Sequence, residues 1–214
     1  MRVLIVGAGG HGQVVADILL ARVRSGCPDG HPVGFLDDDP ALLAHTFLGL
    51  PVLGSVAQAS SIPHDAVVVA IGDNPTRQRI SLRLEAQGER FATAIHPAAV
   101  VGSDVEIGAG TMVSAGAVVN PGARIGRGVI LNTACSVDHH NFVGDYAHIA
   151  PGAHLGGDVR IEEGALIGLG AGVLPGRQVG AWATVGAGAT VTRNVPDRTT
   201  VAGVPARTMT REEK

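Results

Sequence analysis

The stretch Ile125–Leu155 has the sequence IGRGVI LNTACS VDHHNF VGDYAH IAPGAH L, in which every sixth residue is aliphatic. The spacing continues in both directions, at Ile95, Val101, Ile107, Val113, Val119, Ile125, Leu131, Val137, Val143, Ile149, Leu155, Ile161, Ile167, Val173, Val179, Val185 and Val191. Four residues after each aliphatic position the residue is usually small or β-branched, with Asn141 and Arg177 as exceptions. Since Leu, Ile and Val make up only roughly a fifth to a quarter of an average protein, this period is the strongest signal in the chain.

A period of six predicts one short strand and one turn per hexad, with the aliphatic side chain inward and glycine or a polar residue at the turn. Three strands close a triangular coil of three hexads, so side chains that are three hexads apart stack on one face. About six coils at roughly 4.8 Å each give a prism about 27 Å long. We therefore expect a parallel β-helix over residues 93–214.

Residues 1–92 lack this period and alternate strand and helix patterns. Strands are predicted at 3–6, 32–36 and 66–71, with a last strand at 91–95 that leads into the coil, and helices are predicted at 12–24 and 75–87. This alternation predicts a small parallel α/β domain of Rossmann-like organisation before the coil.

Composition narrows the classes of function. The 214 residues carry 16 basic and 19 acidic side chains, a formal charge of −3, which disfavours nucleic acid as a partner. The longest charge-free run, 107–123, contains Gly, Asn, Ser and Pro at regular intervals, so no membrane insertion is expected. The apolar stretch Val3–Val6 is too short for a signal peptide, which predicts a cytoplasmic protein. Two cysteines, Cys27 and Cys135, cannot form a disulfide framework and are expected to be free.

The motif Gly7-Ala8-Gly9-Gly10-His11-Gly12 fits G-x-G-x-x-G between a strand and a helix, where backbone N–H groups and the helix dipole bind phosphate. Asp37-Asp38-Asp39 ends the second strand, where a carboxylate would bind ribose, and Gly72 follows the third strand. About 92 residues are too few for a complete dinucleotide domain, so one nucleotide or nucleotide sugar is favoured over NAD. A purely structural turn is the alternative.

Four histidines, His139, His140, His148 and His154, lie close together in the repeat. His139 and His140 fall at a turn and should be exposed, and imidazole suits proton transfer at neutral pH. The alternative is that these histidines are ordinary polar residues at surface turns. His148 and His154 occupy the same place in consecutive hexads and point away from each other, so no metal is predicted, with a zinc site between subunits as the alternative.

Several segments resemble one family: Met1–Gly12, Gly34–Asp38, Ala70–Asn74, Ile130–His139 and Ala202–Arg207. Together they are similar to bacterial sugar acetyltransferases of cell-surface polysaccharide biosynthesis. These include nucleotide-linked 4-amino-sugar N-acetyltransferases of the bacillosamine and perosamine pathways and sialic acid O-acetyltransferases. The resemblance covers almost the whole chain and implies a left-handed, hexapeptide-repeat β-helix that binds acetyl-CoA.

The resemblance also implies a homotrimer with active sites between neighbouring coils, and a role for individual residues. The nucleotide-linked amino sugar would be bound by Gly9, Gly10, His11, Asp37, Asp38 and Gly72. Acetyl-CoA would be bound by His148, Gly157, Leu169 and Ala187, with the Gly157 N–H facing the thioester oxygen. His139 matches the general base. The family usually has Glu or Asp after the base, whereas this chain has His140. This departure weakens the role of His139 or favours a substrate whose amine needs less help from a base. Asp138 is the alternative acidic partner, although neighbours in a strand-like segment point to opposite sides.

The spacing of three hexads between His139 and Gly157 independently places them on adjacent coils. We therefore predict His139, His140 and Gly157 as the catalytic group, and direct attack in a ternary complex, because Cys135 falls at an inward position. The predicted reaction is acetyl transfer from acetyl-CoA to the amino group of a nucleotide-linked sugar, a 4-amino-4,6-dideoxy sugar. The alternatives are a sialic acid type O-acetyltransferase and a non-enzymatic trimeric scaffold.

Overall fold

The computed structural model describes residues 1–27 and 29–209 and divides into two compact units, Met1–Pro97 and Ala98–Lys214. The division lies slightly later in the chain than the boundary expected at 92/93. Ala92 donates its N–H to the Val67 oxygen at 2.9 Å, and Arg22 donates to the Ile95 oxygen at 3.4 Å. These bonds hold the connecting segment to the first unit. Among the described residues, the helices are too short or too polar to span a membrane.

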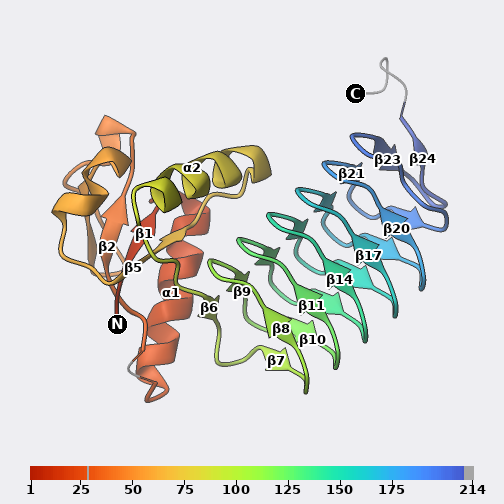
Figure 1. Ribbon diagram of the computed structural model, residues 1–214, viewed down its shortest axis with the longest axis horizontal. Helices are drawn as coiled ribbons and strands as arrows, with labels where there is room; N and C mark the ends of the chain where they lie inside the picture. The colour runs from red at the N-terminus through yellow and green to blue at the C-terminus, as the bar shows by residue number, and fades with distance from the viewer. Residues whose placement is uncertain (28, 210–214) are drawn as a thin grey trace. The chain divides into compact units, whose positions relative to one another are not determined.

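The first unit contains a five-stranded sheet in the order β3-β4-β2-β1-β5 (Figure 1). Its strands are β1 (Arg2–Val6), β2 (His31–Leu36), β3 (Thr46–Phe47), β4 (Leu50–Gly54) and β5 (Ala66–Val69), and β6 (Ala94–Ile95) follows before the division. Strands β1, β2, β4 and β5 run parallel, as the predicted α/β class requires. The antiparallel β3–β4 hairpin was not predicted from the sequence.

Two helices accompany this sheet, α1 (Gly10–Arg24) and α2 (Asn74–Ala86), with short 3-10 helices at Pro40–Leu42 and Val56–Ser61. Helix α2 begins where Asp73 accepts a hydrogen bond from the Thr76 N–H at 2.9 Å. This bond holds the pKa of Asp73 below its usual range. Helix α1 begins two residues earlier than predicted, with Gly9 as its N-cap. A Cβ on Gly12 would overlap the Gly7 oxygen, so glycine allows the helix to pack directly on the turn.

The second unit is a β-helix of short strands, of two residues each except for β23, arranged in three parallel stacks (Figure 1). The first stack is β7 (Val100–Val101), β10 (Val118–Val119), β13 (Ser136–Val137), β16 (His154–Leu155), β19 (Gly172–Val173) and β22 (Thr190–Val191). The second is β8 (Glu106–Ile107), β11 (Arg124–Ile125), β14 (Phe142–Val143), β17 (Arg160–Ile161) and β20 (Gln178–Val179). The third is β9 (Met112–Val113), β12 (Ile130–Leu131), β15 (His148–Ile149), β18 (Leu166–Ile167), β21 (Thr184–Val185) and β23 (Thr200–Ala202), with β24 (Arg207–Thr208) antiparallel at its end.

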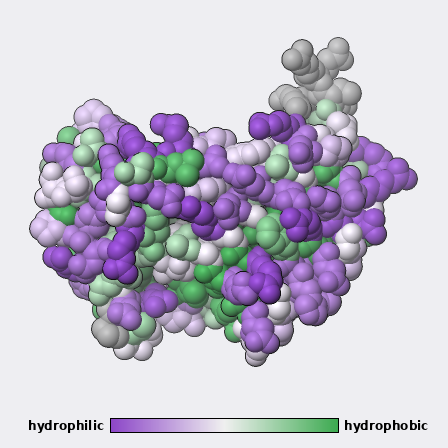
Figure 2. All heavy atoms as spheres, in the orientation of Figure 1, coloured by the Kyte–Doolittle hydropathy of each residue, from purple (hydrophilic) through white to green (hydrophobic). Residues whose placement is uncertain are grey.

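The register confirms the expected stacking, because from β7 to β22 each strand pairs with the one three hexads along the chain, as Ser136 does with His154. From Val113 to Val191 every aliphatic position of the repeat is buried. Asn141, an exception in the sequence pattern, lies inside the coil and accepts the Val159 N–H at 2.5 Å. Polar side chains cover most of the face in view, with smaller apolar areas among them (Figure 2).

Candidate active site

In the first unit, the three predicted turns come together at the carboxyl edge of the sheet. A cavity of about 210 Å³ is lined by Gly7, Leu36, Asp37, Asp38, Val56, Ile71, Thr76, Arg79 and Ile80. Gly7 belongs to the first turn, the two aspartates to the second and Ile71 to the third. Thr76 and Arg79 come from α2 and were not among the predicted binding residues. Both residues lie within the predicted helix at 75–87. The helix pattern alone does not show which face of the helix packs at the edge of the sheet.

The carboxylates of Asp37 and Asp38 accept hydrogen bonds from backbone N–H groups at this edge of the sheet. Asp37 accepts the Ala8 N–H at 2.8 Å through Oδ2 and the Asp39 N–H at 2.9 Å through Oδ1. Asp38 Oδ1 accepts the Val56 N–H at 2.8 Å. Each carboxylate oxygen has two lone pairs, so these bonds leave capacity for a ligand hydroxyl.

The glycines of the first motif divide into two kinds. Gly7 has φ +107°, and a Cβ there would lie 2.9 Å from the Ala70 oxygen, so Gly7, like Gly12, is required for packing. A Cβ on Gly9, Gly10 or Gly72 would meet nothing within 4 Å. These three predicted binding glycines are exposed and border open space, but they do not line the cavity.

His11 lies next to a buried cation. Burial, followed by the charge of Arg77, lowers the pKa of His11 to about 4, so the ring is neutral at pH 7. Its Nε2 is buried and has no hydrogen-bond partner among residues 1–27 and 29–209. Arg77 is fully buried and donates to the Ile71 oxygen at 2.9 Å, the Gly72 oxygen at 3.3 Å and Asn74 Oδ1 at 2.8 Å. Arg77 was not among the predicted residues, although it shares a helical face with the aliphatic residues Ile80 and Leu84.

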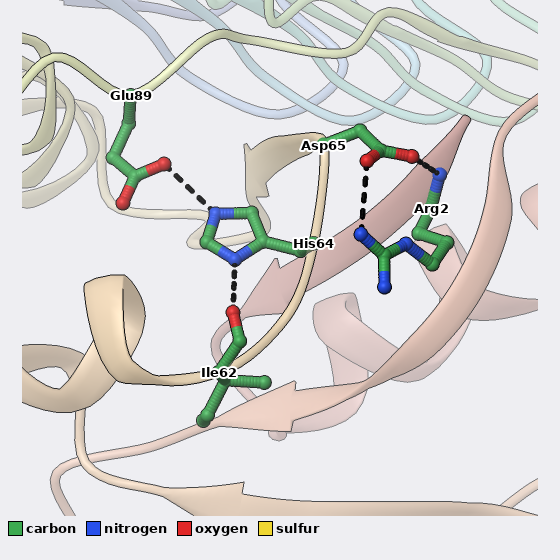
Figure 3. A network of polar contacts seen from close by, with 5 residues as sticks. All are labelled: Arg2, Ile62, His64, Asp65 and Glu89. Atoms are coloured by element: carbon green, nitrogen blue, oxygen red, sulfur yellow. Dashed lines mark hydrogen bonds and ion pairs between the residues drawn. The ribbon is translucent and has the colours of Figure 1, made fainter.

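A second cavity of the first unit, about 380 Å³, lies beside a buried polar network (Figure 3). His64 approaches the Ile62 oxygen at 2.7 Å through Nδ1 and Glu89 Oε2 at 2.8 Å through Nε2. Nearby, Arg2 pairs with Asp65 at 3.1 Å and lowers the pKa of that carboxyl. These contacts link β1, the segment before β5 and the segment after α2, and we assign them a structural role.

In the second unit, the ring of His139 lies against Gly157. A Cβ on Gly157 would be 2.5 Å from both Nε2 and Cε1 of His139, so only glycine leaves room for this ring. The backbone links the same coils, because Asp158 donates its N–H to the His139 oxygen at 3.1 Å. The imidazole is exposed. The structure therefore brings together the two residues that the three-hexad spacing predicts to be neighbours.

The Gly157 N–H has no acceptor among the described residues. At the same place in several other hexads, proline removes the N–H or a side-chain oxygen accepts it. Proline is present at Pro121, Pro151 and Pro175, and the N–H groups of Arg127, Thr133, His139 and Ala181 donate to Asp or Asn oxygens. Gly157 is buried in the single chain, and its N–H is therefore an unpaired donor directly beside an imidazole, the kind of group that stabilises an oxyanion.

His139 faces His140 rather than a carboxylate. The two Nδ1 atoms are 3.0 Å apart, with the rings edge to face at 78°. Asp138 does not reach the imidazole, because its Oδ1 accepts the His139 N–H at 2.8 Å and the Asn120 side chain at 2.9 Å. These two bonds lower the pKa of Asp138. Asp138 therefore does not replace the acidic neighbour of the base.

Asp158, one coil above His140, completes this cluster and was missed by the sequence analysis. One of its oxygens and a ring nitrogen of each histidine all lie within 4.8 Å of one another. The signal was available, since position 158 follows position 140 by three hexads. Two imidazoles and a carboxylate are also a ligand set that could hold a divalent cation. The sequence predicts no metal.

Of the predicted coenzyme residues, Gly157 lies beside His139, whereas His148, Leu169 and Ala187 lie elsewhere on the β-helix. His139 and Gly157 follow strands of the first stack, whereas Leu169 and Ala187 follow strands of the third stack, at a different corner. Leu169 is 60% exposed. His148, in β15, accepts from Asn132 Nδ2 at 3.1 Å, and Asn132 is held by the Thr133 N–H at 2.8 Å. Within a single chain, the predicted base therefore lies at a different corner of the β-helix from most of the predicted coenzyme residues.

Cys135 is buried inside the coil, and burial raises the pKa of its thiol to about 12. Both cysteines are free, as predicted. A buried, protonated thiol is a poor nucleophile, so the described residues favour direct transfer over an acyl-cysteine intermediate.

A hexapeptide β-helix with an exposed imidazole beside an open amide, joined to a Rossmann-like unit, defines an acyltransferase of the hexapeptide-repeat class. Residues 2–84 match the family model of the PglD N-terminal domain. The chain is 34% identical over 221 residues to GDP-perosamine N-acetyltransferase of Escherichia coli O157:H7, covering 97% of this chain and 96% of that protein.

Two solved structures are similar over nearly the full length. The acetyltransferase domain of PglB from Neisseria gonorrhoeae FA1090, in complex with acetyl coenzyme A, has a TM-score of 0.90 at 39% identity, covering 97% of this chain and 98% of that one. PerB from Caulobacter crescentus, in complex with CoA and GDP-perosamine, has a TM-score of 0.89 at 37% identity, covering 98% of each chain. The chain belongs to the sugar N-acetyltransferase family. This confirms the predicted family, the left-handed β-helix and the enzyme class, and it disfavours the O-acetyltransferase and scaffold alternatives.

Proposed function

We propose that this protein transfers the acetyl group of acetyl-CoA to the amino group of a nucleotide-linked 4-amino-4,6-dideoxy sugar, with His139 as general base. The observation that carries the residue assignment is the contact between the His139 ring and Gly157, whose N–H has no acceptor among the described residues. The relatives named above support the substrate class, because one acts on GDP-perosamine and two were solved with acetyl-CoA, or with CoA and GDP-perosamine.

The chemistry requires an unprotonated amine, a proton acceptor and a donor for the developing oxyanion. The amine attacks the thioester carbonyl carbon, and its proton passes to Nε2 of His139. The Gly157 N–H stabilises the negative oxygen of the tetrahedral intermediate. The C–S bond then breaks, and the CoA thiolate takes the proton from His139.

The nucleotide sugar is assigned to the cavity of the first unit. Asp37 and Asp38 line this cavity and keep free lone pairs for hydroxyl groups. Gly9, Gly10 and Gly72 do not line it, but they are exposed on the same turns and border open space that the rest of the ligand would occupy. Arg79 adds a positive charge to the same cavity, which suits a diphosphate. His11 does not line this cavity, and its Nε2, which has no partner among the described residues, is buried, so the role of His11 in binding rests on the family resemblance.

The coenzyme is assigned to His148, Gly157, Leu169 and Ala187, with Gly157 after a strand of the first stack and the other three on or after strands of the third stack. A homotrimer resolves this separation, because the corner with His139 and Gly157 in one copy would meet the Leu169 corner of the next. A ring of three heterologous contacts closes without leaving an open face. The cytoplasmic location stays a prediction.

The test is free thiol release from acetyl-CoA with a panel of UDP-, GDP- and dTDP-linked amino sugars, with sialic acid as the hydroxyl acceptor. We expect thiol release with at least one 4-amino sugar and none with sialic acid. His139→Asn should lower kcat by on the order of 10²-fold with the KM for acetyl-CoA near normal. An unchanged kcat would remove His139 as the base. Turnover of sialic acid alone would contradict the proposed acceptor.

A further inference from the structure

We infer that His140 and Asp158 act together as positioning residues for the base, with Asp158 supplying from the next coil the negative charge that residue 140 lacks. The inference rests on the proposed role of His139. It starts from the 3.0 Å separation of the two Nδ1 atoms, which accommodates one proton between two nitrogens.

That single proton couples the tautomers of the two rings. If His139 donates through Nδ1–H, its Nε2 carries a lone pair and can accept a proton from the amine. His140 then accepts through Nδ1 and carries its own hydrogen on Nε2. In the reverse arrangement His139 would carry a hydrogen on Nε2 and could not act as base. The Nε2 of His139 is the atom that lies beside Gly157, so only the first arrangement is productive.

Glycines determine how both rings lie. The His139 ring lies against Gly157, and the His140 ring lies against Gly122, where a Cβ would be 2.8 Å from Cδ2. Residue 140 has φ +56°, a left-handed conformation that turns its side chain toward this corner. The Nδ1 pairing therefore follows from contacts on both sides of the two rings.

Asp158 has no structural task of its own. Three other aspartates of the coil accept backbone N–H groups, Asp138 from His139, Asp145 from Arg127 and Asp197 from Ala181. The Asp158 side chain accepts no hydrogen bond within the part of the chain that the structure describes, and it is exposed. Its oxygen is instead within 4.8 Å of a nitrogen of each ring. At this distance its charge stabilises a cation on either imidazole.

The charge of Asp158 matters because the histidine pair becomes positively charged during the transfer. When His139 Nε2 takes the proton of the attacking amine, the histidine pair gains one positive charge. The Nδ1 proton of His139 can then shift to Nδ1 of His140, so both rings share the charge next to Asp158. When the C–S bond breaks, Nε2 gives its proton to the thiolate and the pair returns to neutral.

Asp158→Asn tests the charge with little change in shape. We expect kcat to fall about tenfold, with both KM values changed less than twofold. The acidic limb of the kcat profile should move to lower pH, because the protonated pair loses its stabilising charge. Asp104→Asn is the matched control. Asp104 is exposed, with φ +56° against +57° for Asp158, and it lies three coils below at the same corner. We expect kcat and the pH profile of this control to match the wild type.

His140→Glu provides the rescue, since it places a carboxylate directly beside His139. In this background Asp158→Asn should cost less than twofold in kcat. His140→Asn, which can accept a hydrogen bond but cannot carry charge, should lower kcat about tenfold. The inference would be overturned if Asp158→Asn had the wild-type kcat and pH profile. It would also be overturned if Asp158→Asn lowered kcat tenfold in the His140→Glu background.

Nitrogen-15 NMR of the neutral rings gives a readout independent of activity. We expect the Nδ1–H tautomer for His139 and the Nε2–H tautomer for His140, and the opposite pair would overturn the inference. The proposed function can be judged separately. If His139→Asn keeps full kcat, the base assignment is wrong. If it loses kcat while Asp158→Asn and His140→Asn keep theirs, only the positioning inference is wrong.

Discussion

His139 and Gly157 are separated by a whole coil of the chain, yet the imidazole of one occupies the space that a side chain on the other would fill. The contact places the imidazole, which can accept a proton, next to the Gly157 N–H, which donates to no described residue. Acyl transfer to an amine uses both groups within one step, so their contact is the structural basis of the proposed mechanism.

Gly157→Ala tests this contact directly. The added methyl would lie 2.5 Å from Nε2, so the ring must move, and we expect kcat to fall on the order of 10²-fold. Gly172→Ala is the matched control, because a Cβ there meets nothing within 4 Å and it too lacks a left-handed φ. Steady-state kinetics and melting temperatures of both variants would check this. Equal kcat for the two would show that the contact is unimportant for turnover.

His148→Ala should weaken acetyl-CoA binding. We expect the KM for acetyl-CoA to rise about tenfold with kcat within threefold of the wild type, because a binding contact is lost rather than a reacting group. His154→Ala is the control, since His154 holds the same hexad position and contacts Ser136 at 2.8 Å. If the KM for acetyl-CoA is unaffected by His148→Ala, the coenzyme assignment fails.

His11 should make the fold less stable in acid. Its pKa is about 4 in the folded chain against 6.5 for a free ring, so the unfolded chain binds more protons between these values. The free energy of unfolding should therefore fall as pH drops from about 6.5 to 4, by on the order of 2 kcal/mol from this residue. In His11→Gln this part of the loss should disappear, while it should persist in the control His31→Gln, at an exposed position. Denaturant unfolding at pH 7 and pH 5 would check it, and identical pH dependence in wild type and His11→Gln would contradict it.

Removal of metal ions should leave activity intact. The two Nδ1 atoms of the histidine pair already hydrogen-bond each other, so the site needs no cation to orient the base. We expect unchanged kcat after dialysis against a chelator. A loss of activity that zinc restores would show instead that His139, His140 and Asp158 hold a catalytic metal.

The second unit was predictable almost residue by residue, because each aliphatic side chain meets the same environment one coil later. That regularity also placed His139 beside Gly157. The first unit was predicted less completely. The β3–β4 hairpin turns at Leu48 and Gly49, both with positive φ, and a leucine there carries none of the Asn-Gly or Asp-Gly signal of such turns. Arg77 was missed because the helix pattern alone does not show what its buried face meets.

The amino-acid sequence by itself determined the hexad repeat, the stacking of every third hexad and the strand-and-helix order of the first unit, since all three follow from local periodicity. Only the tertiary structure decided how the polar side chains pair. Asp138 binds backbone and the Asn120 side chain, His139 faces His140, and Asp158 approaches both rings from the next coil. The reason is that a hydrogen bond depends on the direction in which each side chain leaves its turn, which the spacing of residues along the chain does not specify.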